Sequence, residues 1–244
     1  MRALILNSGV GRRMGQASAA RPKAMTRLAG GETIFQRQLR LLGGAGVGEF
    51  VVTTGPFPEQ LAEAAAKPEL AGLRVQFVPN PDYRTTNYIY SMHLAGPALA
   101  GADTVLVLHG DLVFDQALVA GLLNDERPDL APYHPEAPLP EKDFRVRLRQ
   151  GRLAEVGLGL TGPDCYAFQP FYKLSARAWA LWSARIDDYV RAGTLGVYAE
   201  NALNEVAAQA RIMPFSYAGH LLAEVDTPGD LTALDAALRL ELNL

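Results

Sequence analysis

Residues 3–15 read Ala-Leu-Ile-Leu-Asn-Ser-Gly-Val-Gly-Arg-Arg-Met-Gly, and residues 22–25 read Pro-Lys-Ala-Met. The apolar run Ala3–Leu6 predicts a buried strand, and the glycines after it predict a loop. Glycines that follow a strand let backbone N–H groups approach phosphates. Arg13 and Lys23 add positive charge to the same loop. The stretch therefore predicts a strand and loop that bind a triphosphate.

Two other phosphate-binding loops fit this stretch less well. A Walker loop needs Gly-x4-Gly-Lys-Ser/Thr, which the sequence lacks. The dinucleotide fingerprint Gly-x-Gly-x-x-Gly needs a third glycine, and this chain has Met14 there, after two arginines. Positive side chains suit a triphosphate that reacts better than a pyrophosphate that is only held.

The segments that follow alternate between helix and strand patterns. Further strands are expected at Glu49–Thr54, Leu73–Val78 and Thr104–Leu108, and helices at Thr33–Leu42, Glu59–Ala66, Tyr88–Leu94 and Leu118–Leu123. The run Thr104–Leu108 is apolar on both faces, which is typical of a central strand. The alternation predicts an α/β fold with a Rossmann-like, mixed, mostly parallel central sheet and helices on both faces.

The second half is expected to add a small hairpin and helices to the same sheet. Residues 128–140 contain five prolines and predict a loop, which leaves open whether it closes over a substrate as a lid. The other expected elements are a hairpin from Phe144–Leu148 and Leu153–Val156, strands at Cys165–Tyr172 and Arg211–Phe215, and helices at Ala176–Val190, Val197–Ala208 and from Pro228, with Thr227 as the cap. We predict one domain over residues 1–244, with a nucleotide-binding half to about residue 125 and an acceptor-side half from about 126.

Composition narrows the class of protein. Of the 244 residues, 49% are hydrophobic and 20% charged, which is the globular range and excludes disordered, collagen-like and coiled-coil chains. The single cysteine, Cys165, excludes an internal disulfide and a zinc-type cysteine cluster. No apolar run is long enough to span a membrane. The apolar run near the start of the sequence is also too short for the apolar region of a signal peptide. We expect a cytoplasmic protein without a membrane partner.

Charge is unevenly distributed along the chain. The net charge is −3, yet residues 1–42 hold eight Lys or Arg and one acid, so this segment alone carries +7. A basic end on an acidic protein indicates a local anion site rather than a nucleic-acid surface. We therefore expect no nucleic-acid partner.

These motifs resemble the GT-A-like nucleotidyltransferases, or nucleoside-diphosphate pyrophosphorylases. Members have a Gly-x-Gly-x-Arg-Met/Leu loop followed by Pro-Lys-Ala or Pro-Lys-Cys. The chain is most similar to the bacterial phosphocholine cytidylyltransferase branch and its 2-aminoethylphosphonate relatives. Three further stretches carry this resemblance: Asn80–Leu94, His109–Phe114 and Glu224–Leu234.

The resemblance implies that two acidic residues hold the catalytic Mg²⁺, and by motif these are Asp111 and Asp226. Both follow apolar stretches, and ligands of open α/β sheets gather at the carboxyl ends of strands. Lys23, Arg13 and Asp111 are the expected catalytic residues. The expected nucleotide-binding residues are Leu6, Asn7, Ser8, Gly9, Gly11, Arg13, Lys23, Asn87 and Gly110.

Expectations for the acceptor site come from the second half. The predicted acceptor-binding residues are Glu200, Arg145 and Tyr198. An ammonium group is held by aromatic faces and carboxylates. Further candidate walls are Tyr88, Tyr90, Trp179, Trp182 and Tyr189, and further counter-charges are Asp187, Asp188 and Glu205. Aromatic residues at helical spacing usually belong to a core, and acids on helices usually face solvent.

The implied reaction is Mg²⁺-dependent transfer of CMP from CTP to phosphocholine or 2-aminoethylphosphonate, with release of pyrophosphate, by a monomer or homodimer. A sugar-1-phosphate nucleotidyltransferase or a molybdenum-cofactor guanylyltransferase remains an alternative within the same class. A non-catalytic nucleotide-binding regulatory protein is a second alternative, which the joint presence of Arg13, Lys23, Asp111 and Asp226 disfavours. The sequence leaves the choice of base open.

Overall fold

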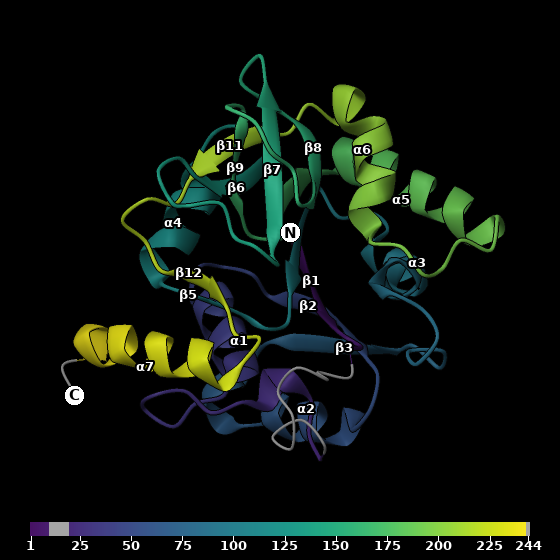
Figure 1. Ribbon diagram of the computed structural model, residues 1–244. Helices are drawn as coiled ribbons and strands as arrows, with labels where there is room; N and C mark the ends of the chain where they lie inside the picture. The colour runs from purple at the N-terminus through teal and green to yellow at the C-terminus, as the bar shows by residue number, and fades with distance from the viewer. Residues whose placement is uncertain (10–19, 243–244) are drawn as a thin grey trace.

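A ten-stranded sheet runs through the molecule in the order β3-β2-β1-β4-β10-β6-β9-β7-β8, with β11 paired to β6 (Figure 1). The computed structural model describes residues 1–9 and 20–242. The strands of this sheet are β1 (Arg2–Asn7), β2 (Glu49–Thr54), β3 (Arg74–Pro79), β4 (Thr104–His109), β6 (Leu130–His134), β7 (Phe144–Arg149), β8 (Arg152–Leu158), β9 (Cys165–Phe168), β10 (Phe171–Ser175) and β11 (Met213–Ser216).

The sheet has a parallel part and an antiparallel part. Strand β1 lies between β2 and β4 and is parallel to both, and β3 extends this parallel part. Strand β10 then pairs with β4 in the antiparallel sense, and the hairpin β7–β8 lies at the far edge. The carboxyl ends of β1 and β4 therefore meet at one edge, beside the strands of the second half. The predicted mixed α/β fold is confirmed.

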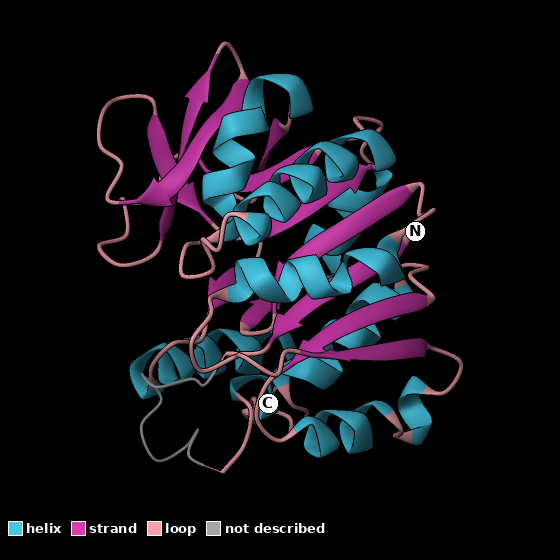
Figure 2. Ribbon diagram, turned by 90° about the vertical axis from the view of Figure 1, so that its right-hand side faces the viewer, coloured by secondary structure: helices cyan, strands magenta, loops and turns pink. Residues whose placement is uncertain are grey.

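Helices cover both faces of the sheet (Figure 2). One face carries α3 (Tyr88–Leu99), α5 (Ala176–Arg191) and α6 (Ala199–Ala210), and the other carries α1 (Ile34–Gly44), α2 (Pro58–Ala65) and α4 (Gln116–Asn124). Short 3₁₀ turns lie at η2 (Lys23–Met25) and η3 (Pro68–Leu70). None of the helices in residues 1–9 and 20–242 is long and apolar enough to cross a membrane.

A second, two-stranded sheet positions the end of the chain. It pairs β5 (Leu112–Phe114) with β12 (Leu222–Glu224), and α7 (Pro228–Leu242) follows directly. Val113 and Val225 pack with Leu234 and Leu238 of α7 in a small buried cluster. Because β5 follows β4 immediately, this cluster holds the start of α7 next to the end of the central strand.

Two predicted elements of the second half are wrong. The expected loop at residues 128–140 contains the buried strand β6. Proline lacks a backbone N–H that could bond to a neighbouring strand. However, β6 pairs with β10 only at Leu130 and with β9 only at Tyr133 and His134, so Pro132 lies between these two ladders. The single strand expected at Cys165–Tyr172 is two strands, β9 and β10. Both pair with β6, but β9 also pairs with β7 whereas β10 also pairs with β4.

Gly55 allows the chain after β2 to pass the loop after β1. A Cβ atom at Gly55 would overlap the backbone carbonyl oxygen of Ser8, whereas one at Gly48 meets nothing within 4 Å. We expect Gly55→Ala to lower the free energy of unfolding by about 1–3 kcal/mol, the usual cost of overpacking. Urea denaturation measures this, with Gly48→Ala as the control that stays near wild type. Equal stability of the two variants would contradict the close approach.

Candidate active site

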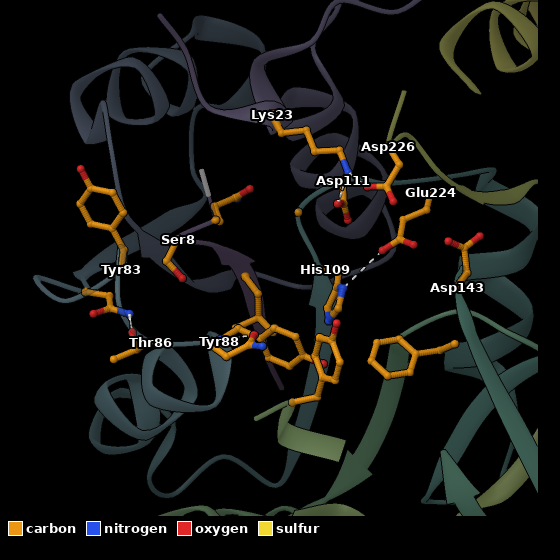
Figure 3. A pocket seen from close by; sticks show the side chains of 18 of the residues that line it. Ser8, Lys23, Tyr83, Thr86, Tyr88, His109, Asp111, Asp143, Glu224 and Asp226 are labelled. Atoms are coloured by element: carbon orange, nitrogen blue, oxygen red, sulfur yellow. Dashed lines mark hydrogen bonds and ion pairs between the residues drawn. The ribbon is translucent and has the colours of Figure 1, made fainter. Parts of the chain in front are cut away.

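A cavity of about 380 Å³ opens at the carboxyl ends of β1 and β4 (Figure 3). Its walls come from several parts of the chain that are far apart in sequence. They include residues 6–9 at the end of β1, residues 109–111 at the end of β4, residues 142–144 at the start of β7, and Glu224 and Asp226 at the end of β12. This is the edge where open α/β sheets bind ligands.

Lys23 bridges two carboxylates in this cavity. Its ammonium donates to Asp111 Oδ2 at 2.5 Å and also to Asp226 Oδ1. Burial alone would lower the pKa of Lys23, but the two carboxylates outweigh burial and raise it. Burial likewise opposes ionisation of Asp111, yet Lys23 and then His109 hold its pKa below the usual value. Lys23 and Asp111 are therefore both charged near neutral pH.

Backbone hydrogen bonds bring the two carboxylates together. The N–H of Val225 donates to the carbonyl oxygen of Asp111 at 3.1 Å, which joins β12 to the end of the central strand. The N–H groups of Asp226 and Thr227 both donate to Asp230 Oδ2, at 3.0 and 2.7 Å. Thr227 caps α7, as predicted, by accepting from the N–H of Asp230. Asp226 is thus fixed by the first turn of α7.

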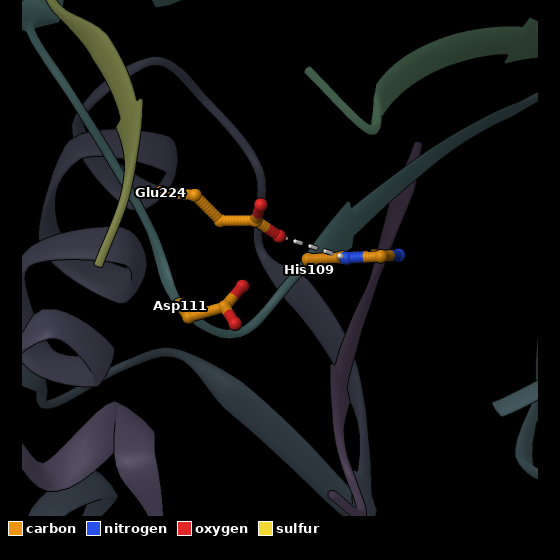
Figure 4. A group of neighbouring side chains, drawn as sticks. All are labelled: His109, Asp111 and Glu224. Carbon is orange, nitrogen blue, oxygen red and sulfur yellow. Dashed lines mark ion pairs between the residues drawn. The ribbon is translucent and has the colours of Figure 1, made fainter. Parts of the chain in front are cut away.

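The carboxylates supply donors that suit a hard divalent cation. Asp111 Oδ1 is buried and has no hydrogen-bond partner among the residues that the structure describes. Glu224 belongs to two candidate ligand sets, one with His109 and Asp111 (Figure 4) and the other with Asp143 and Asp226. Carboxylate oxygens are the ligands that Mg²⁺ prefers. The residues present therefore fit a divalent ion.

His109 and Glu224 add a second titratable pair beside this site. His109 Nδ1 lies 3.5 Å from Glu224 Oε1. Burial and the neighbouring Asp111 raise the pKa of Glu224, while His109 opposes that rise. For His109, burial alone would lower the pKa, but Glu224 and Asp111 outweigh burial and raise the pKa overall. The crowding of carboxylates leaves this end of the cavity attractive to cations.

The loop after β1 forms the opposite wall. Asn7 and Ser8 are buried, and Ser8 Oγ lies 2.6 Å from Ser91 Oγ of α3. Asn80 donates to the same Ser91 oxygen at 2.9 Å. A Cβ atom at Gly110 would overlap Asn7 Oδ1, so only glycine fits beside this loop. The wall is thus held from behind by buried hydrogen bonds, which leaves its outer side facing the cavity.

Four rings meet at the other end of the cavity, and we call them the aromatic cup: Tyr88, His109, Phe144 and Tyr198. Ring centroids lie 4.8 Å apart for Tyr88 and His109, 6.4 Å for His109 and Phe144, 5.2 Å for Phe144 and Tyr198, and 5.8 Å for Tyr198 and Tyr88. The contacts close a circle. Leu158 at the mouth is 47% exposed and Tyr198 is 38% exposed, although both are large apolar side chains. Such exposure at a cavity is typical of a surface that a ligand covers.

The structure brings most of the predicted nucleotide and metal residues to this cavity. Those lining it are Leu6, Asn7, Ser8, Gly9, Lys23, Asn87, Gly110, Asp111 and Asp226. The predictions for Gly11 and Arg13 fall outside the described residues.

Of the three predicted acceptor residues, one lines the cavity and two do not. Tyr198 lines the cavity, whereas Glu200 is buried beneath it and 2% exposed. Arg145 donates to the carbonyl oxygens of Pro140 and Leu160, both at 2.8 Å, and does not line the cavity. Neighbouring side chains of a strand point to opposite faces, so β7 turns Phe144 toward the cavity and Arg145 away from it.

Most of the other acceptor candidates also lie elsewhere. Tyr88 lines the cavity, but Trp179 and Trp182 belong to the core, and neither Tyr90 nor Tyr189 contributes to the lining. The candidate counter-charges form ion pairs on the helices: Asp187 with His93, and Asp188 and Glu205 with Arg185.

The lining residues that were not among the predicted site residues include His109, Asp143, Phe144 and Glu224. A signal for Glu224 existed in the sequence Glu224-Val225-Asp226, because alternation along an extended chain puts the two acids on one side. Val225 between them is fully buried in the cluster under α7. Nothing in the local sequence of residues 143–144 indicates that β7 reaches this cavity.

Residues 3–159 match the family model described as the MobA-like NTP transferase domain, over more than half of the chain. The chain belongs to this family. This MobA-like NTP transferase domain is a nucleotidyltransferase enzyme, as the predicted family implied. Nucleotidyltransferases of this type generally use a divalent metal ion, and the acidic groups at the cavity provide ligands for one.

Relatives of this MobA-like domain include cytidylyltransferases. It is 39% identical over 122 residues to CMP-5'-(3-aminopropyl)phosphonate synthase of Streptomyces rubellomurinus, a match that covers 50% of this chain and 19% of the relative. The CTP:phosphocholine cytidylyltransferase LicC of Streptococcus pneumoniae has a TM-score of 0.79 at 18% identity, over 97% of this chain and 98% of that one. The inositol-1-phosphate CTP transferase of T. maritima has a TM-score of 0.74 at 20% identity, over 94% and 90%. At 18% and 20% identity, these two structures show that the fold is alike, and no more than that.

Removing the Lys23 ammonium leaves two buried carboxylates facing each other. We expect Lys23→Met to lower the free energy of unfolding by about 2–3 kcal/mol, because an unpaired buried charge is costly. Millimolar Mg²⁺ should restore part of this loss by binding the folded state. Thermal unfolding with and without Mg²⁺ measures both effects.

Lys142→Met is the matched control, since Lys142 lines the same cavity but is exposed and has no ion pair recorded in residues 1–9 and 20–242. Its stability should stay within about 0.5 kcal/mol of wild type. A Lys23→Met variant as stable as this control, with no response to Mg²⁺, would contradict the charge balance described above.

Proposed function

We propose that this enzyme transfers CMP from CTP to a small acceptor with a phosphate or phosphonate at one end and an ammonium at the other, and that it releases pyrophosphate. The observation that carries the proposal is the single cavity, which joins a phosphate-type loop, the Lys23–Asp111–Asp226 cluster and the aromatic cup. Each part matches one component of this reaction.

The nucleotide occupies the wall made by the ends of β1 and β4. Leu6, Asn7, Ser8, Gly9 and Gly110 form the backbone cradle for it, with Asn87 at the start of α3 on the same side. Gly11 and Arg13 of the loop belong to this proposal on sequence grounds. The 39% identity to a protein named for a CMP-linked product supports CTP as the nucleotide.

Asp111 and Asp226 hold the Mg²⁺ in this proposal. The ion would neutralise charge on the nucleotide phosphate oxygens when bound. Lys23, which lies between the same two carboxylates, is close enough to neutralise charge on the pyrophosphate as it leaves. Asp230 keeps Asp226 in place from the first turn of α7.

The chemistry requires positioning more than proton transfer. An oxygen of the acceptor phosphate attacks the α-phosphorus of CTP and forms the new P–O bond. The bond between the α-phosphorus and the bridging oxygen to the β-phosphate breaks, and pyrophosphate takes that electron pair. The second pKa of a phosphate monoester is about 6, so the attacking oxygen is already ionised near neutral pH. Catalysis then rests on orientation and charge stabilisation.

The acceptor ammonium belongs in the aromatic cup. Aromatic faces attract cations, and Asp143 and Glu224 lie at the edge of the cup, where they add negative charge. The phosphate end would then face Lys23 and Asp111. The aminoalkylphosphonate in the name of the relative supports this class of acceptor.

The test is pyrophosphate release with Mg²⁺ and CTP, UTP or GTP, and with phosphocholine, 2-aminoethylphosphonate or glucose-1-phosphate as acceptor. We expect turnover with CTP and an amino acceptor. Asp111→Asn should lower kcat/KM about 100-fold or more, because it removes charge at the reacting phosphates.

Asp187→Asn is the control for this variant, since Asp187 pairs with His93 on the helical face and is not part of the cavity lining. Its activity should match wild type. Preference for glucose-1-phosphate, or for UTP or GTP over CTP, would refute the proposed substrate pair. No turnover with any of these pairs would refute it as well.

A further inference from the structure

Glu200 is a buried acidic residue that lies directly beneath the aromatic cup. It is in the first turn of α6 and is 2% exposed. Its Oε2 accepts a hydrogen bond from the Tyr88 hydroxyl, and its Oε1 accepts one from the Tyr172 hydroxyl at 3.0 Å. Both carboxyl oxygens therefore face a tyrosine hydroxyl.

Within the described ranges, the hydrogen bonds to Glu200 come from the two tyrosine hydroxyls, and His109 also interacts with Glu200 electrostatically. A buried carboxyl is costly unless it is hydrogen-bonded, and here the two tyrosines supply those hydrogen bonds. Tyr172 belongs to the hydrophobic core, where its ring lies 5.0 Å from that of Trp182. Tyr88 is the tyrosine that connects Glu200 to the cavity.

The tyrosines keep their protons in this arrangement. Burial, and after it the charge of Glu200, raises the pKa of both Tyr88 and Tyr172 well above the usual value. Each hydroxyl therefore stays a donor, and Tyr88 donates along its own ring axis to a negative charge. Hydrogen bonds of this kind polarise the donor, which makes the face of the Tyr88 ring more negative.

We infer that Glu200 is a positioning residue that makes the aromatic cup selective for a cation by polarising Tyr88, without touching the acceptor itself. The cup then recognises an organic ammonium through the negative faces of its tyrosine and phenylalanine rings. The field of Glu200 reaches the cup through protein interior, where it is screened less than in water. This inference rests on the proposed function, since it assigns the cup to the ammonium of the acceptor.

The test compares each cation with a neutral molecule of the same shape. Phosphocholine is paired with 3,3-dimethylbutyl phosphate, and 2-aminoethylphosphonate with propylphosphonate. Binding of all four to the full-length protein is measured by titration calorimetry with Mg²⁺ present. We expect wild type to bind one of the cations at least about fivefold tighter than its neutral partner, the range of a desolvated cation–aromatic contact.

Glu200→Gln keeps the shape of the side chain and removes its charge. We expect this variant to bind the cation about fivefold more weakly and the neutral partner unchanged, so that selectivity disappears. Tyr88→Phe should behave in the same way, because the ring remains but its hydroxyl no longer joins it to Glu200. Glu205→Gln is the control, since Glu205 is in the same helix and pairs with Arg185 and Tyr189. It should keep wild-type selectivity.

Several outcomes would overturn the inference. One is equal affinity of wild type for cation and neutral partner, or no binding of either pair. Another is an equal loss of affinity for the cation and for the neutral partner in Glu200→Gln. A merely structural role of Glu200 would give this result, together with a lowered midpoint of thermal unfolding. Selectivity that persists in Glu200→Gln alongside normal CTP turnover overturns the inference and leaves the proposed function standing. Selectivity that Glu200→Gln abolishes, in a protein that turns over no CTP, supports the inference and refutes the proposed function.

Discussion

Two buried carboxylates from distant parts of the chain need a cation between them, and the rest of the site depends on that constraint. Asp111 ends the central strand, and Asp226 precedes the last helix. The backbone hydrogen bond from Val225 to Asp111 brings the two aspartates together, and the Lys23 ammonium balances the charge of their carboxylates. Two carboxylates that both contact one ammonium are close enough to repel each other strongly inside a protein. The same pair is therefore both a structural junction, which needs Lys23, and the place where a divalent ion fits.

The two walls of the cavity differ in chemistry. The parallel strands β1 and β4 end in a glycine-rich wall with polar side chains, which suits phosphates. Phe144 of β7 and Tyr198, the N-cap of α6, join Tyr88 and His109 from the first half of the chain, so the other wall is aromatic. One edge of a single sheet thus offers an anion site and a cation site side by side. An acceptor with opposite charges at its two ends fits such a cavity.

Local features of the fold and site were predictable from the sequence, whereas features that depend on distant partners were not. The run Ala3–Leu6, the glycine loop and the acids after apolar stretches mark strand ends by themselves. The strand β6 looked like a loop because residues 128–140 contain five prolines. Its partners β9, β10 and β11 all come later in the chain, and β11 lies some 80 residues away. Glu200 was expected to face a ligand, but the sequence does not say which tyrosines lie above that turn of α6.

In the proposed reaction, Lys23 shares its two carboxylates with a divalent ion when nucleotide binds. A crystal of the protein soaked with Mn²⁺ and a non-hydrolysable CTP analogue tests this directly by anomalous diffraction. We expect an anomalous peak between Asp111 and Asp226, with the Lys23 ammonium turned from the carboxylates to the nucleotide phosphates. A nucleotide bound in the cavity with Lys23 still bridging both aspartates, and no manganese beside them, would contradict it.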